Sequence, residues 1–127
     1  MAAITYLDTH VAAWLFAGDV MRLSAAARVA IEGDDLLVSP AVVLELQYLY
    51  ETKRVADKAE LVVEDLRHRL SVRVCDLPFP DVSRRALALT WTRDPFDRLI
   101  VAQAAVRDSK LVTKDRVLRR RYAASVW

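Results

Sequence analysis

Short apolar runs alternate with helix-like stretches along the whole sequence. Runs rich in β-branched and aliphatic residues predict strands, whereas apolar residues that recur every three or four positions predict helices. The expected strands cover residues 4–7, 36–38, 72–77 and 110–113, with an edge strand at 124–127. The expected helices cover residues 11–17, 25–32, 40–51, 58–70, 82–90, 95–104 and 115–121. Strands separated by helices are typical of an α/β sandwich, in which helices cover both faces of a mostly parallel sheet of four to five strands.

Residues that cap helices precede several of these segments. Ser39-Pro40 and Asp94-Pro95 each place a capping side chain before a proline at the first helical position. Asp57 and Glu60 match a capping box, and Asp81 is expected to cap the helix that begins one residue later.

The composition is that of a folded, soluble protein. The chain has 127 residues, of which 54% are apolar, with two glycines and four prolines, so we expect one domain over residues 1–127 and no disorder. Its apolar runs fall well short of the roughly 18 to 20 residues that cross a bilayer, and its first residues lack the basic segment of a signal peptide. We therefore expect a cytoplasmic protein that does not enter a membrane. The single cysteine, Cys75, is expected to be a buried packing residue.

The net charge of +2 conceals an uneven distribution. Residues 1–52 hold two basic residues against seven acids, a balance of −5, whereas residues 53–127 hold 17 against ten, a balance of +7. Fifteen of the 19 basic residues are arginines, whose planar guanidinium suits phosphate oxygens better than a lysine does. Nucleic acid is therefore a candidate partner for the second part, although a run of charge is more often a solvated helix face.

Five acidic residues fall where a parallel sheet binds its ligands, just beyond the carboxyl ends of the strands. Asp8 directly follows the first expected strand, and Asp115 follows the fourth by one residue. Asp94 and Asp97 are three residues apart, so both lie on one side of the first turn of their helix. Glu45 lies within an apolar helical stretch, where a carboxylate needs a partner or an exposed position.

Each of these acids also has a purely structural interpretation. Asp8, Asp94 and Asp115 are residues of the type that caps a helix N-terminus, and Asp97 lies where the helix dipole favours an acid. Glu45 fits such an interpretation least, because burying an unpartnered glutamate is costly. Several separate caps at one edge of the sheet explain the pattern less well than one shared site.

A cluster of carboxylates needs cations, because like charges repel. Ligation by oxygen alone suits Mg²⁺, with Mn²⁺ as the alternative, whereas Zn²⁺ prefers nitrogen and sulfur. His10, His68 and Cys75 could supply those atoms, but they have no ligand-like spacing. Divalent ions among carboxylates near basic side chains are typical of phosphodiester hydrolysis, in which the metal activates a water and holds the phosphate. The only glycines are Gly18 and Gly33, so no phosphate-cradling glycine loop competes with this hypothesis.

Four ordered motifs resemble those of the PIN-domain ribonucleases and, among these, the VapC toxins of bacterial toxin-antitoxin pairs. The motifs are Leu7-Asp8-Thr9-His10, Leu44-Glu45-Leu46 after Ser-Pro, Arg93-Asp94-Pro95-Phe96-Asp97-Arg98-Leu99-Ile100 followed by Ala102-Gln103-Ala104, and Leu111-Val112-Thr113-Lys114-Asp115. They span nearly the whole chain in the expected order. The resemblance implies a PIN-like three-layer sandwich and a metal-dependent endoribonuclease acting as a toxin. Its implied partners are RNA, a cognate antitoxin whose C-terminal segment approaches the acidic pocket, and a second copy of the chain in a homodimer.

The resemblance also assigns roles to the five acids. It implies that Asp8, Glu45, Asp97 and Asp115 are catalytic and hold Mg²⁺, or Mn²⁺ in its place. Asp94 matches a position that is commonly acidic, and it is expected to serve as a helix cap or as a secondary metal ligand.

Five further residues are expected to contact the substrate. The resemblance implies that Thr9 and Thr113 place their hydroxyls at the rim of the pocket, with helix capping as the alternative. Arg98, Lys114 and Arg116 are candidate phosphate contacts because they adjoin the acids in the sequence. The alternative for each of these three is an ordinary solvated position on a helix surface.

Two other functions compete with the nuclease hypothesis. Aromatic residues such as Trp14, Phe16 and Tyr48 could line a groove for a partner helix, which would make the protein a binding module with a degenerate acidic site. Core packing is, however, the usual role of such residues. A phosphoacceptor module similar to a receiver domain is the weaker option, because Asp8 has no acidic neighbour in the sequence.

Overall fold

The centre of the molecule is a sheet of five parallel strands. The computed structural model describes residues 3–127, so Met1 and Ala2, the first residues of the N-terminal segment considered as a signal peptide, lie outside the described residues. The strands are β1 (Ile4–Leu7), β2 (Asp35–Val38), β3 (Arg73–Val74), β4 (Lys110–Val112) and β5 (Ser125–Val126). Their order across the sheet is β3-β2-β1-β4-β5, and each neighbouring pair is parallel. The predicted α/β class is thereby confirmed.

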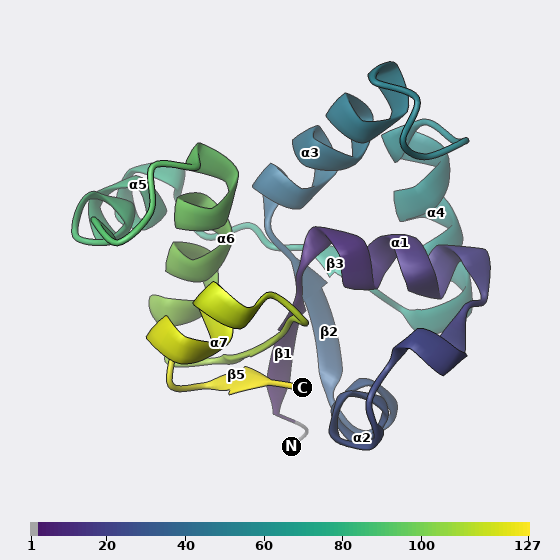
Figure 1. Ribbon diagram of the computed structural model, residues 1–127, viewed down its shortest axis with the longest axis horizontal. Coiled ribbons are helices and arrows are strands. Elements are labelled where there is room, and N and C mark those ends of the chain that lie inside the picture. Colours follow the sequence, from purple (N-terminus) through teal and green to yellow (C-terminus); the bar gives the residue numbers. More distant parts are fainter. Residues whose placement is uncertain (1–2) are drawn as a thin grey trace.

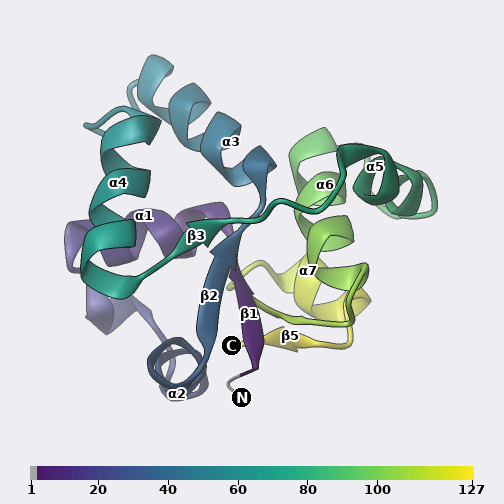
Figure 2. The same ribbon diagram turned by 180° about the vertical axis from the view of Figure 1, so that it is seen from behind.

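Seven α-helices within residues 3–127 cover the sheet. They are α1 (Thr9–Ala17), α2 (Ala25–Gly33), α3 (Pro40–Glu51), α4 (Ala59–Leu70), α5 (Phe79–Leu87), α6 (Pro95–Ala105) and α7 (Arg116–Arg121), with a short 3-10 turn at Val20–Arg22. α1 to α4 gather on one side of the sheet and α5 to α7 on the other, as Figure 1 and Figure 2 show from opposite directions. This arrangement is the predicted three-layer sandwich. No helix in the described part of the chain is long and apolar enough to cross a membrane.

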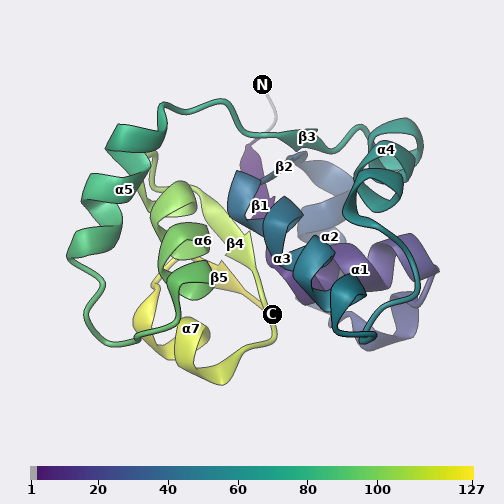
Figure 3. The same ribbon diagram turned by 90° about the horizontal axis from the view of Figure 1, so that it is seen from above.

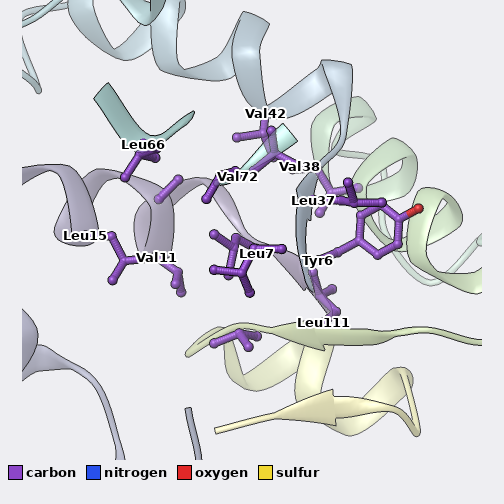
Figure 4. Packing of buried hydrophobic residues seen from close by; sticks show 14 of the residues in the cluster. Tyr6, Leu7, Val11, Leu15, Leu37, Val38, Val42, Leu66, Val72 and Leu111 are labelled. Carbon is purple, nitrogen blue, oxygen red and sulfur yellow. The ribbon is translucent and has the colours of Figure 1, made fainter. Parts of the chain in front are cut away.

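The first strand is buried on both of its faces. Leu7 points toward α1, where Figure 4 shows it near Val11, whereas Tyr6 points to the other side of the sheet. The Tyr6 hydroxyl lies 3.2 Å from Sγ of Cys75, which is buried as predicted. Burial on both faces explains why this strand, apart from Thr5, shows no alternation of apolar and polar residues.

The start of α4 differs from the prediction. The capping box predicted at Asp57 does not form, because the N-terminal cap is Lys58, which makes no side-chain bond to the helix. Instead, Oε1 of Gln47 on α3 accepts the backbone N–H of Ala59 at 3.2 Å. A side chain from a neighbouring helix therefore provides the cap that the local sequence was expected to provide.

The segment between β2 and α6 also departs from the prediction. The third strand is confined to Arg73–Val74, at the edge of the sheet. The helix predicted from Val82 to Thr90 instead covers Phe79–Leu87, and Asp81 lies in its first turn rather than capping it. Pro80 is compatible with this earlier start, because a first-turn residue has no intrahelical N–H bond to lose.

The strand order reverses between β1 and β4. Leu7 is paired with Val112, and the N–H of Asp8 donates to the Val112 carbonyl at 3.0 Å. The residues that follow these two strands therefore begin side by side. Figure 3 looks onto this end of the sheet, with α1 and α3 on one side and α6 and α7 on the other. In open α/β sheets, ligands bind at such a reversal point.

Candidate active site

The five acids singled out in the sequence line one pocket of ≈ 510 Å³ at this end of the sheet. Asp8 precedes α1, Glu45 lies in the middle of α3, Asp94 and Asp97 begin α6, and Asp115 precedes α7. The N-termini of α1, α6 and α7 thus meet at the pocket, and their positive dipole ends favour the negative charge gathered there. The other lining residues are His10, Val11, Trp14, Arg54 and Lys114.

Three of the acids are helix caps as well as pocket residues. Oδ1 of Asp94 accepts the backbone N–H groups two and three positions further on, at 2.9 and 3.2 Å. Oδ1 of Asp115 does the same at 2.8 and 3.0 Å, and Oδ1 of Asp8 accepts the next N–H at 2.8 Å. Since capping uses one oxygen of each carboxylate, the structural and functional interpretations of the sequence are compatible.

Asp8 is the most deeply placed of the acids, with 8% of its surface exposed. Its Oδ2 accepts a 2.6 Å hydrogen bond from the hydroxyl of Thr113, which is fully buried. Burial raises the pKa of Asp8 above its usual value, and the bonds from Thr113 and the Thr9 backbone oppose that rise. Asp8 is thus a carboxylate fixed in one orientation by two donors.

Glu45 reaches the pocket from α3, across from Asp8. The hydroxyl of Thr9 donates a hydrogen bond to Oε1 of Glu45 and so connects α1 to α3. Burial raises the pKa of Glu45, the hydrogen bond from Thr9 lowers it, and the charges of Asp8 and Asp94 raise it further. The predicted need of this glutamate for a partner is met by a hydroxyl group rather than by a base.

Asp97 has a strongly raised pKa, and burial contributes to this shift more than any one of the neighbouring acids does. Burial and the neighbouring carboxylates, Asp94 foremost among them, raise its pKa from 3.8 to about 7. Within residues 3–127, no group donates a hydrogen bond to its carboxylate. Asp97 is therefore the acid whose charge is least compensated by the protein itself.

Basic side chains lie near these acids without pairing to them. In residues 3–127, none of the five acids has a lysine, arginine or histidine nitrogen within 4.0 Å. The Lys114 ammonium lies 6.0 Å from the centre of the Trp14 ring, and the Arg54 guanidinium lies 5.9 Å from that of Tyr48. Both cations line the pocket, so they are placed to meet a negatively charged ligand.

The chemistry of the donor set fits a hard divalent cation. The donors are carboxylate oxygens. Burial and the repulsion between carboxylates raise the pKa of Asp97, and a bound cation would relieve that repulsion. In the described residues, no three aspartate, glutamate, histidine or cysteine side chains form a ready-made metal cage. Mg²⁺ does not need one, since it keeps several waters and is usually bound through one or two carboxylates.

The three predicted phosphate contacts occupy different positions. Lys114 lines the pocket, as expected. Arg98 does not reach it, because its guanidinium donates to the carbonyls of Ala86 and Leu87 at 3.0 to 3.2 Å and so holds the end of α5. Arg116 is exposed at the start of α7, outside the residues that line the pocket.

The two threonines predicted at the rim lie beneath the acids. Both Thr9 and Thr113 are fully buried, and both hydroxyls donate to carboxylates of the pocket. They therefore position Glu45 and Asp8, and neither is exposed to a substrate.

Four lining residues, Val11 among them, were not predicted from the sequence to belong to this pocket. His10 and Trp14 follow Asp8 along α1 and lie four residues apart, so helical spacing could have identified them as neighbours on one face. Arg54 lies in the connection between α3 and α4, and no sequence signal places it here.

Comparison with known proteins agrees with this geometry. Residues 5–124 match the PIN domain family. The chain is 39% identical over 117 residues to Ribonuclease VapC22 of Mycobacterium tuberculosis, a match that covers 89% of this chain and 88% of that protein.

Two solved toxin-antitoxin structures share the fold. DNA-bound VapBC from Salmonella typhimurium superimposes with a TM-score of 0.62 at 18% identity, covering 98% of this chain and 96% of that one. VapBC2 from Rickettsia felis, bound to a promoter fragment, gives a TM-score of 0.58 at 18% identity, covering 92% of each chain. From the family match and the 39% identical relative together, the chain belongs to the PIN-domain family and is a homologue of a VapC ribonuclease.

Proposed function

We propose that this protein is a VapC-type endoribonuclease that cleaves RNA phosphodiester bonds with the help of Mg²⁺ and acts as the toxin of a toxin-antitoxin pair. The observation that carries the proposal is the gathering of five acids from four separate segments in one pocket, without a basic partner for any of them. The 39% identical ribonuclease relative supports the same activity. A degenerate site is disfavoured, because all four carboxylates expected of an intact one are present and line the same pocket.

Asp8, Glu45, Asp97 and Asp115 are the residues that would hold the metal, with Asp94 beside them. Mg²⁺ in such a site supplies an activated water and neutralises charge on the phosphate and the leaving oxygen. The protein holds Asp8 and Glu45 in fixed orientations through the hydroxyls of buried threonines. Asp97 would lose its proton as the cation enters, since metal ligands bind in their deprotonated form.

Lys114 and Arg54 complete the site for an anionic substrate. Both line the acidic pocket, and neither forms an ion pair there. We assign them to the phosphates of the RNA, because a charged hydrogen-bond donor to a phosphate oxygen both orients and attracts the substrate.

A cognate antitoxin is the second proposed partner. An apolar groove of ≈ 400 Å³ lies beside the acidic pocket, between α1, α3 and the start of α4, and His10, Trp14 and Arg54 line both. Phe16, Leu46, Leu49, Val55 and Val62 add apolar surface to the groove. We propose that an apolar segment of the antitoxin occupies it and covers the acidic pocket, in keeping with the toxin-antitoxin complexes among the structural relatives. Homodimer formation and the cytoplasmic location stay predictions.

Metal-dependent cleavage tests the enzymatic proposal. The purified protein is incubated with a single-stranded RNA in the presence of Mg²⁺, and again with excess chelator. We expect cleavage that the chelator abolishes and that Mg²⁺ or Mn²⁺ restores. Equal cleavage with and without chelator would overturn the proposal.

The toxin role needs a separate test, because a nuclease need not be a toxin. A short reading frame directly upstream should encode a small protein that forms a complex with this chain and abolishes its RNA cleavage. Substitution of Trp14 by alanine should weaken that complex. If no such neighbour exists, or if it leaves cleavage unchanged, the toxin role is refuted while the nuclease proposal stands.

A further inference from the structure

Several basic side chains in residues 53–127 are bound to partners elsewhere in the protein. Arg67 and Arg69 on α4 pair with acids three and four residues before them, at 2.7 and 2.6 Å. Arg98 holds backbone carbonyls of α5, and Lys110 pairs with Asp34 at 2.9 Å. These residues supply little free positive charge for a ligand.

The arginines of α7 differ from these. The helix carries Arg116, Arg119, Arg120 and Arg121, all exposed, and no acid within its own bounds. In residues 3–127, none of their guanidinium groups forms an ion pair or a side-chain hydrogen bond. The sequence of α7 thus concentrates four unpaired positive charges on six residues.

A favourable interaction with the helix dipole does not account for the whole cluster. Basic residues are favoured in the last turn of a helix, which fits Arg119, Arg120 and Arg121. Arg116 lies in the first turn, where the dipole disfavours positive charge.

The position of α7 connects this charge to the active site. Its cap is Asp115, one of the acids of the pocket, and the helix runs from there for about 9 Å. Leu118 anchors its inner face in the core, and the Tyr122 hydroxyl at its end donates to the Ser109 carbonyl at 2.5 Å. The arginines therefore lie on a helix that is anchored in the core and whose N-terminal cap is one of the pocket acids.

We propose that α7 binds the phosphates of single-stranded RNA next to the cleaved bond and so guides the strand into the acidic pocket. The inference rests on the proposed nuclease function and adds the surface that binds the substrate. Arginine forks match phosphate oxygens and are indifferent to base sequence. Because these contacts are the same before and during the reaction, they lower KM and leave kcat unchanged.

The test compares two double variants, one that removes two positive charges from α7 and one that removes two positive charges from α4 and α5. Arg119→Gln/Arg120→Gln is compared with the control Arg67→Gln/Arg84→Gln, whose arginines are exposed on α4 and α5 and do not line the pocket. KM and kcat for a single-stranded RNA oligonucleotide are measured with saturating Mg²⁺ over a range of salt concentrations. Thermal unfolding of each variant shows that the fold is intact.

We expect the α7 variant to raise KM roughly tenfold at about 0.1 M salt and to reduce the slope of log KM against log salt by about 0.7 for each phosphate that the helix no longer binds. Its kcat should be unchanged. Arg119→Lys/Arg120→Lys, which keeps the charge but not the guanidinium fork, should restore part of the loss, as a purely structural role would not. The control should behave like the unsubstituted protein.

Equal effects of the two double variants would overturn the inference, because net charge and not α7 would then matter. An unchanged KM in the α7 variant would do the same and would leave another macromolecule, such as the antitoxin, as the partner of this helix. In both cases metal-dependent cleavage by the unsubstituted protein would persist, which separates failure of this inference from failure of the nuclease proposal. If the unsubstituted protein cleaves no RNA, both fail together.

Discussion

The hydroxyl of Thr113 donates a 2.6 Å hydrogen bond to Oδ2 of Asp8 and accepts one of 3.1 Å from the backbone N–H of Asp115. One buried hydroxyl therefore connects the acid that follows β1 to the acid that follows β4, across the point where the strand order reverses. This hydroxyl therefore holds the Asp8 carboxylate in place relative to the backbone at Asp115.

Thr113→Val should separate positioning from folding. Valine keeps the shape but removes the donor to Asp8, whose pKa rises further because that bond lowers it. We expect cleavage to fall roughly tenfold or more, as is usual when the partner of a metal-binding group is removed. The cleavage rate as a function of pH measures the effect, and the profile should move to higher pH.

Thr5→Val is the matched control for that experiment. Thr5 is also fully buried and also donates a 2.6 Å hydrogen bond to an aspartate, Asp34, beside the N-terminal end of β2 and away from the pocket. Both variants should lose about 1 to 3 kcal/mol of stability, but only Thr113→Val should lose activity. Equal losses of activity would show that Thr113 acts through stability alone.

The stability of the metal-free protein should fall as pH rises from about 4 to about 7. The pKa of Asp97 is about 7 in the folded protein against 3.8 ordinarily, so in this window the folded state holds a proton that the unfolded state has released. The stabilisation is complete below the ordinary pKa of 3.8 and is lost as the pH rises through the folded-state pKa of about 7. Urea unfolding in chelator at a series of pH values measures this dependence.

Asp97→Asn should flatten that dependence, because the amide mimics the protonated acid at every pH. Above pH 7 the metal-free variant should be more stable than the unsubstituted protein, because the Asp97 charge lowers the free energy of unfolding. A pH dependence that Asp97→Asn leaves unchanged would assign it to another group.

Substitutions of Asp94 should distinguish its charge from its role as a cap. Asp94→Asn keeps an oxygen that can accept the N–H groups of Phe96 and Asp97, whereas Asp94→Ala removes it. We expect only the alanine variant to lose stability, by about 1 kcal/mol. Both should lower the pKa of Asp97, since the Asp94 charge raises it. The free energy of unfolding and the pH profile of cleavage measure the two roles, and an equal loss of stability in both variants would contradict the cap assignment.

Gln47→Leu should destabilise the protein without affecting the site. Oε1 of Gln47 provides the cap that α4 lacks in its own sequence, and loss of a cap typically costs about 1 kcal/mol. Urea unfolding should show this loss, while kcat and KM stay unchanged. Unaltered stability would mean that solvent satisfies the N–H of Ala59 equally well.

Part of the acidic pocket was predictable from the sequence because several of its acids follow simple local rules. Asp8 comes directly after β1, Asp115 follows β4 after two intervening residues, and Asp94 stands before a proline that starts a helix. In a parallel fold these signals converge at one edge of the sheet, so their meeting could be anticipated before the strand order was known.

What the sequence could not provide are interactions between distant segments. The cap of α4 comes from Gln47, and the position of Arg54 depends on how the α3–α4 connection lies. Arg98 adjoins Asp97 in the sequence but points to the end of α5, because successive helical residues face different directions. The hydroxyls of Thr9 and Thr113 were expected to face a substrate, and only the packing of α1 against α3 and of β1 against β4 turns them toward carboxylates.

The central claim is that the carboxylates of the pocket cleave RNA, and single amide variants test it most directly. Asp8→Asn, Glu45→Gln, Asp97→Asn and Asp115→Asn each remove one charge, and asparagine still caps α1 and α7. Glu60→Gln, an exposed acid of α4 outside the pocket, is the matched control. The measurement is kcat/KM for a single-stranded RNA at saturating Mg²⁺, with folding verified by thermal unfolding. We predict losses of about 100-fold or more in the pocket variants and none in the control, whereas folded Asp8→Asn and Asp97→Asn proteins that cleave RNA at the unsubstituted rate would contradict the claim.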